Sequence, residues 1–215
     1  MRTIIVLLGI IFLFLIYYSL NNIYIKQPSY TKQEYYNNGK PKATSTIEYT
    51  KNLPINKDGF KDVKIVGAMK SFYDTGELES EFKHIDKDRS ESISYYKNGK
   101  IKSKTKYFKN KVQDTFETYR EDGSLQFTTE YSNGLENGMS TKYDGKGRVV
   151  FQIPYKNGKR EGLGKFYENG ILQLSVEYKN DLQNGIQREY DKNGNIIREN
   201  IYKNDKEEKW LPYNG

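Results

Sequence analysis

The sequence of 215 residues contains no cysteine, one histidine and one tryptophan. Without cysteine the chain has no disulfide framework, no thiol nucleophile and no cysteine-ligated zinc site, and a single histidine leaves no histidine cluster. Hydrophobic residues are also scarce, because they make up 35% of the chain against roughly 45 to 50% in ordinary domains. A closely packed two-layer body of this length is therefore not expected.

The one long hydrophobic run is N-terminal. Residues 3–25 carry no charge, and about 20 apolar residues suffice for a helix to cross a bilayer. No small-x-small cleavage site follows. We interpret residues 1–25 as an uncleaved transmembrane signal anchor, or as a signal peptide of a secreted protein if the segment is removed, and residues 26–33 as a linker. An N-terminal export signal places the body in the cell envelope, outside the cytoplasm.

Tyrosine is abundant, with 20 residues, and it recurs regularly. Glycines that we predict to lie in turns are 23 or 24 residues apart after a first spacing of 37: Gly39, Gly76, Gly99, Gly123, Gly147, Gly170 and Gly194. Tyrosines three or four residues earlier form a first series: Tyr36, Tyr73, Tyr96, Tyr119, Tyr143, Tyr167 and Tyr190. A second series follows the turns by eight residues: Tyr107, Tyr131, Tyr155, Tyr178 and Tyr202. A fixed period of this length indicates a repeat architecture.

Each repeat has the pattern of two short strands. Residues from Leu125 to Tyr131 and from Val149 to Tyr155 alternate between two faces, as strands do. Asn-Gly or Asp-Gly pairs, as at 98–99, 122–123, 169–170 and 193–194, predict type I′ hairpin turns. Loops such as Asn133–Gly138 return the chain. We expect an all-β fold, an elongated single-layer antiparallel meander of about seven tandem β-hairpins over residues 34–205, preceded by an N-terminal transmembrane helix.

Several segments depart from this pattern. Residues 50–66 form an insertion, which we interpret as an extra hairpin or loop, with a binding loop as the sharper alternative. Pro154 lies within a strand and cannot donate a ladder hydrogen bond, so we predict a bulge or a frayed end there. We expect His84 to be a solvated side chain rather than a titrating switch. Residues 206–215, with Trp210, are expected to cap the last open strand.

The units Tyr95–Lys102 (Tyr-Tyr-x-Asn-Gly-Lys-x-Lys) and Tyr155–Gly162 (Tyr-Lys-Asn-Gly-Lys-Arg-Glu-Gly) resemble MORN repeats, in particular those of the bacterial YwqK-like family. The resemblance covers residues 34–205. It implies a noncatalytic array of β-hairpins that acts as a scaffold, a membrane tether or an interaction module, and an antitoxin-like role for some members. Such repeats also occur in certain phosphatidylinositol phosphate kinases, but the likeness is confined to the repeat and implies no kinase activity.

The sequence predicts no catalytic residues, no cofactor and no metal site. No G-x-G-x-x-G or G-x-x-x-x-G-K-[ST] loop is present to hold phosphates. Pairs of carboxylates such as Glu117 and Glu130 are available, but glycoside hydrolysis needs two carboxylates about 5 to 10 Å apart in a cleft. A single-layer sheet offers no deep cleft, so we expect no enzyme.

The apolar face of the sheet is expected to be the binding surface, because a sheet with one exposed aromatic face needs a cover. Its expected members are Tyr96, Tyr119, Tyr143, Tyr167, Tyr190, Tyr107, Tyr131, Tyr155, Tyr178 and Tyr202. We expect an unknown protein partner or a second copy of the chain, with anionic lipid or the cell wall as a further surface given the net charge of +7. No arginine-rich cluster points to nucleic acid. The alternative is a carbohydrate-binding aromatic array, although such platforms usually contain more than one tryptophan.

Overall fold

The computed structural model of the protein describes residues 30–49 and 63–211. The expected anchor over residues 1–25, the linker up to residue 29 and most of the expected insertion lie outside these ranges. Over residues 30–49 and 63–211, no helix has the length and apolar character needed to span a membrane.

The described residues form sixteen strands, many of them seven to nine residues long. Their bounds are β1 Tyr30–Tyr35, β2 Pro41–Tyr49, β3 Val63–Phe72, β4 Leu78–His84, β5 Arg89–Tyr95, β6 Ile101–Phe108, β7 Lys111–Tyr119, β8 Leu125–Ser132, β9 Leu135–Tyr143, β10 Val149–Lys156, β11 Lys159–Arg160, β12 Gly162–Glu168, β13 Ile171–Lys179, β14 Leu182–Tyr190, β15 Ile196–Lys203 and β16 Lys206–Leu211.

The chain divides into two compact units. The first comprises residues 1–32 and 45–67, of which only strand ends of β1, β2 and β3 are described. The second comprises residues 33–44 and 68–215 and contains every contact discussed below. Within the second unit the strands pair antiparallel in chain order, and the short β11 pairs with β10 beside β12. Lys206–Leu211, part of the expected cap, continues the ladder as β16, which pairs with β15.

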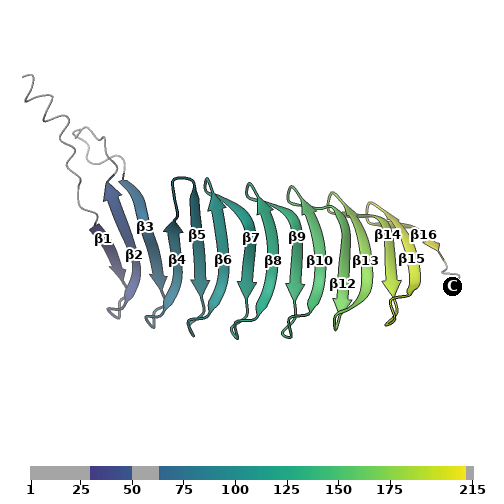
Figure 1. The fold of residues 1–215 in the computed structure, drawn as a ribbon, viewed down its shortest axis with the longest axis horizontal. Coiled ribbons are helices and arrows are strands. Elements are labelled where there is room, and N and C mark those ends of the chain that lie inside the picture. Colours follow the sequence, from purple (N-terminus) through teal and green to yellow (C-terminus); the bar gives the residue numbers. More distant parts are fainter. Residues whose placement is uncertain (1–29, 50–62, 212–215) are drawn as a thin grey trace, which may run out of the picture. The chain divides into compact units, whose positions relative to one another are not determined.

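The strands of the second unit lie side by side in one layer (Figure 1), so the predicted all-β antiparallel meander is confirmed. Among the described residues, Val176 is the one buried hydrophobic side chain. The most deeply buried positions are otherwise small and polar, as at Thr129, Ser140 and Ser175. Without a second layer, a short side chain is covered by larger neighbours on adjacent strands, whereas a long one protrudes. Stability therefore comes from the contacts of each strand with its neighbours.

The register defines two faces, because residues directly opposite each other on antiparallel strands share a face. We use face A for the side on which Phe151 lies opposite Phe166. Face B is the other side, on which Gln152 lies opposite Lys165 and Glu117 opposite Thr128. The aromatic contact between Phe127 and Phe151 places Phe127 on face A as well.

The turns at the glycines of the sequence repeat differ from the type I′ prediction. In the turn Tyr96–Lys100, the Gly99 amide donates to the Tyr96 carbonyl at 2.9 Å and the Tyr96 amide donates to the Lys100 carbonyl at 2.8 Å. Gly99 has φ 80°, whereas Asn98 is not among the residues with positive φ. This is a three-residue loop, a type I turn followed by a left-handed bulge residue. The same pair of bonds recurs at Gly39, Gly76, Gly123, Gly147 and Gly194.

Type I′ turns occur where the loop has two residues. Asn169 and Gly170 both have positive φ, 53° and 84°, and the flanking Glu168 and Ile171 are paired. The one-residue shorter loop accounts for the spacing of 23 between Gly147 and Gly170. At the opposite ends of the strands, five return turns also have two residues with positive φ: Lys109-Asn110, Asn133-Gly134, Asn157-Gly158, Asn180-Asp181 and Asn204-Asp205.

A bulge follows the return turns, and it corrects the interpretation of Pro154. Pro154 stays paired with Met139 inside β10. The break lies in the strand segment paired with β10, at Glu161, which separates β11 from β12. The Glu161 amide donates to the Pro154 carbonyl at 3.0 Å. Equivalent register shifts occur in repeats without proline, as where Tyr131 pairs with Glu136 and Thr129 with Ser140. The irregularity therefore belongs to the repeat and is not caused by the proline.

Candidate functional site

The second tyrosine series forms a row on face A, near the return turns. Its members are partly buried: Tyr107, Tyr131, Tyr155, Tyr178 and Tyr202. Aromatic contacts join this row to neighbouring rings, with centroid distances of 6.0 Å between Phe82 and Tyr107 and 6.5 Å between Phe116 and Tyr131. Further along the same face, Phe151 contacts Phe127 at 5.8 Å and Phe166 at 6.3 Å. Face A thus carries rings from β4 to β15.

Charged groups are interleaved with the middle of this row. Glu136 lies opposite Tyr131 and Arg160 opposite Tyr155. The Arg160 guanidinium lies 4.4 Å from the centroid of the Tyr178 ring and contacts Asp181. Burial, with the Glu136 charge, raises the pKa of Tyr131 and of Tyr155. Burial also raises the pKa of Glu136, because this carboxylate is partly desolvated and faces Asp181. These side chains present both signs of charge between aromatic rings.

The first tyrosine series lies on face B, close to the glycine turns: Tyr119, Tyr143, Tyr167 and Tyr190. The Tyr119 hydroxyl donates to Glu117 Oε2 at 2.7 Å, and the Tyr167 hydroxyl donates to Gln152 Oε1 at 3.2 Å. The Tyr190 hydroxyl lies 3.0 Å from Ser175 Oγ. Burial and the hydrogen bond to Glu117 raise the pKa of Tyr119 to about 12. The phenols of Tyr119, Tyr167 and Tyr190 are therefore bonded to side chains of the sheet itself.

The expectation of one tyrosine face is consequently wrong, and the reason is the turn between the two series. The residue opposite Tyr131 on face A is Glu136. On β9, Glu136 and Tyr143 are an odd number of residues apart, and alternation then puts Tyr143 on face B. Tyr131 and Tyr143 are an even number of residues apart, so alternation along one uninterrupted strand would put them on the same face. They belong to different strands, however, and the turn between these strands changes which residues share a face.

Tyr96 has a third position, together with Tyr36 and Tyr73, at the start of a glycine turn. The Tyr96 hydroxyl donates to the Tyr119 carbonyl at 2.7 Å, and that of Tyr73 to the Tyr95 carbonyl at 2.7 Å. In the same turn, Asn98 Nδ2 donates to the Glu121 carbonyl at 3.0 Å. Each of these turns thus donates hydrogen bonds to the next hairpin, and Tyr96 has a structural contact rather than a free binding surface.

The acidic side chains considered for catalysis are engaged in the sheet. Glu117 accepts the Tyr119 hydroxyl, and Glu130 Oε2 accepts the Met139 amide at 2.9 Å in the bulge. Among residues 30–49 and 63–211, no group of three His, Cys, Asp or Glu side chains is arranged to hold a metal. His84 is exposed, with its ring edge-on to Phe82 at 5.1 Å. A shallow hollow of about 440 Å³ beside the first turn is lined by Tyr35, Tyr36, Asn37, Asn38, Lys42 and Asp74.

Two features were missed from the sequence. One is a carboxylate that fills the bulge in two repeats, since Glu177 accepts the Ile186 amide as Glu130 accepts that of Met139. The signal was available, because a second glycine, Gly138 or Gly185, follows the return turn by four residues. The other is a set of exposed apolar side chains on face B. In the sequence these residues fit the ordinary alternation of a strand, so nothing marks them as exposed.

Four segments of the chain match the protein family described as MORN repeat variant: residues 65–86, 91–110, 160–180 and 183–204. No curated protein matches the chain significantly. Among solved structures, the chain is similar to one titled "Crystal Structure of TarM", with 18% identity and a TM-score of 0.26. The alignment covers 54% of this chain and 20% of that chain, and at that score it carries no structural argument.

Proposed function

We propose that this chain, four segments of which match the MORN repeat variant, is a noncatalytic repeat protein that binds a partner protein along face A and acts as a scaffold. The observation that supports the proposal is the row of Tyr107, Tyr131, Tyr155, Tyr178 and Tyr202 with its adjoining phenylalanines. Partly exposed aromatic side chains accompanied by an arginine are typical of protein interfaces.

The row favours an extended partner over a compact ligand. Successive tyrosines belong to successive repeats, so two strands at about 4.8 Å each separate them by roughly 9.6 Å. Recognition spread over several such steps depends on many moderate contacts, and aromatic and Arg side chains contribute most to such contacts. Tyr155 and Tyr178 of the row, with Arg160 against the Tyr178 ring, are expected to matter most.

The test begins with crosslinking of the full chain in its native membrane fraction and identification of the crosslinked protein by mass spectrometry. Binding of that protein is then measured for the triple substitution Tyr131→Ala, Tyr155→Ala and Tyr178→Ala. The matched control replaces Tyr143, Tyr167 and Tyr190 on face B by alanine, and circular dichroism checks that both variants fold. Loss confined to the face A variant supports the proposal, whereas equal loss in both variants contradicts it.

The same variants distinguish the carbohydrate alternative. A pulldown on purified peptidoglycan and glycans that retains the native chain but not the face A variant would assign the row to sugar binding instead. Membrane anchoring through residues 1–25 with an extracytoplasmic body remains part of the proposal, and protease accessibility in spheroplasts tests it. An antitoxin-like role requires a toxic product from a neighbouring reading frame that forms a stable complex with this chain.

A further inference from the structure

Face B carries a set of exposed apolar side chains near the return turns. Phe108, Leu135, Met139, Leu163 and Leu182 are 36% to 50% exposed. We name them the apolar stripe. Single exposed apolar residues need no explanation, but five of them on one face of a sheet, toward the same end of its strands, indicate an interaction surface.

The register places the stripe on face B. Phe108 follows the face A residue Tyr107 and lies opposite Lys111. Leu182 lies opposite Lys179, which follows the face A residue Tyr178. Met139 lies opposite Pro154, and Leu163 opposite Glu177. The stripe is therefore separated from the proposed partner surface on face A by the thickness of the sheet, and a finding on one surface does not decide the other.

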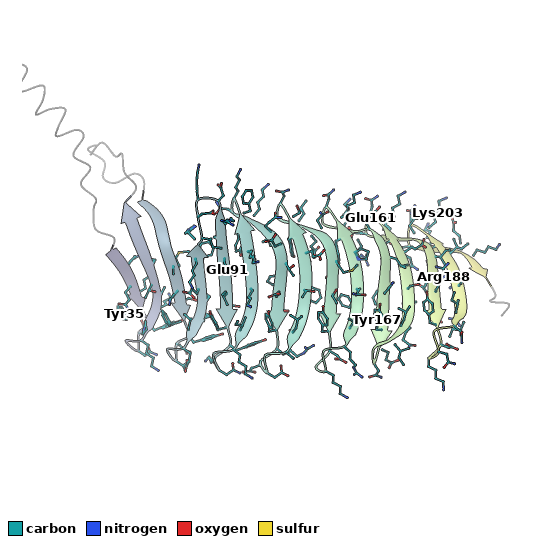
Figure 2. All side chains as sticks on the ribbon, viewed as in Figure 1. Tyr35, Glu91, Glu161, Tyr167, Arg188 and Lys203 are labelled. Atoms are coloured by element: carbon teal, nitrogen blue, oxygen red, sulfur yellow. The ribbon has the colours of Figure 1, made fainter. Side chains whose placement is uncertain are left out.

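Lysines border the stripe. The residues flanking the return turns on face B include lysines that are all exposed: Lys111, Lys156, Lys159, Lys179, Lys203 and Lys206. Figure 2 shows the labelled Lys203 and Glu161 toward the return turns and Tyr167 nearer the glycine turns. The six lysines, which we name the lysine border, lie in the same row as Phe108 and Leu182 and on the return-turn side of Met139 and Leu163.

The charge is specific to this end of the strands. The five return turns 108–111, 132–135, 156–159, 179–182 and 203–206 contain seven lysines and two aspartates, a net charge of +5. The five turns at the other end, 96–100, 120–124, 144–148, 168–171 and 191–195, contain six basic and five acidic residues, a net charge of +1. Asp181, one of the two aspartates, already contacts Arg160. An acidic partner is therefore favoured at the stripe.

The spacing and the turn tips restrict the kind of partner. The repeat advances by roughly 9.6 Å per two strands, and one heptad of an α-helix advances by about 10.5 Å. The tips of the return turns are polar, as at Asn133-Gly134 and Asn157-Gly158, which disfavours insertion of this edge into the apolar part of a bilayer. We propose that the apolar stripe and its lysine border dock an acidic amphipathic helix of a partner protein, with its apolar side chains on the stripe and its carboxylates on the lysines.

The probe is a fluorescent synthetic peptide of about 28 residues, long enough at 1.5 Å per residue for the stripe's roughly 34 Å. It carries leucine at heptad positions a and d and glutamate elsewhere. Fluorescence anisotropy measures its binding to the full chain. The test variant combines Leu135→Glu and Leu163→Glu. The control is Ile197→Glu, which changes a more exposed apolar residue of β15 outside the stripe.

The proposal predicts binding that weakens as salt rises and that falls at least about tenfold in the double variant, because burying one leucine is worth a factor of that size. The Ile197→Glu variant is expected to bind like the native chain, and a peptide with lysine in place of glutamate is expected not to bind. Absence of binding by the glutamate peptide, or equal loss in the control variant, overturns the proposal. Binding to phosphatidylglycerol vesicles without binding to the peptide also overturns it, because the surface is then a lipid-binding one.

Discussion

Substitution of Gly138 by alanine tests the bulge that follows each return turn. Gly138 has φ 134°, a conformation that residues with a Cβ rarely adopt. A Cβ at this position would overlap Glu130 Oε2 and lie 2.7 Å from Glu130 Cβ. The carboxylate can rotate away, but Glu130 Cβ is fixed to the backbone of β8, so the clash requires the two strands to move apart.

The magnitude follows from these two costs. Backbone strain of this kind costs about 1 to 3 kcal/mol, and the overpacked contact adds about 1 to 3 kcal/mol more. Gly170→Ala is the control, because its φ of 84° is left-handed but the nearest atom to its Cβ, Arg148 Cδ, is 3.7 Å away. We expect about 1 to 2 kcal/mol for the control and at least about twice that for Gly138→Ala.

Urea denaturation of the full chain, followed by circular dichroism, measures both variants. The double variant Glu130→Ala, Gly138→Ala retains the backbone strain and Glu130 Cβ but loses the carboxylate, and it is expected to recover only part of the loss. Should Gly138→Ala prove no more destabilising than Gly170→Ala, the bulge geometry described above would be wrong.

Three further predictions concern hydrogen bonds and titration. Tyr96→Phe removes the donor to the Tyr119 carbonyl and should lower the free energy of unfolding by about 1 kcal/mol, whereas the same change at a tyrosine without a protein partner should not. Because the folded-state pKa of Tyr119 is raised from 10.0 to about 12, its contribution to stability is complete below pH 10 and is lost as the pH rises toward 12; ultraviolet titration of the phenolate should show this, with Glu117→Gln titrating earlier. Hydrogen bonds from the Asn195 side chain and from backbone amides of the turn lower the pKa of Asp191 from 3.8, so its contribution is present above that pH and lost as the pH falls further; Asp191→Asn should abolish this dependence in acid denaturation.

The periodic features of the fold could be predicted from the sequence. The alternation from Val149 to Tyr155 and the recurring glycines are enough for a hairpin repeat, since strand period and turn chemistry are local properties. Loop type was not predictable from Asn-Gly pairs alone. Asn98-Gly99 and Asn169-Gly170 have the same two residues, yet one lies in a three-residue loop and the other in a two-residue loop, because the flanking register decides.

The candidate site could be predicted from the sequence only in part. The period groups the tyrosines into two series, but the assignment of Tyr131 and Tyr143 to one surface failed because it depends on how the strands are paired across a turn. The apolar stripe could not be predicted from the sequence, because the exposure of a side chain depends on the neighbouring strands and not on the residue's own segment. Leu135 and Leu174 have the same chemistry, and only Leu135 is exposed.

The short loop at Gly170 shows how this kind of chain tolerates changes in gene length. Loss of one codon within a strand would move each later side chain of that strand to the opposite face, so that face A and face B residues exchange places. At a turn, the chain instead exchanges a three-residue loop for a two-residue one, and Tyr167 keeps the side occupied by Tyr143 and Tyr190. Single-codon insertions and deletions in relatives of this protein should therefore be concentrated where hairpins reverse and be rare between them.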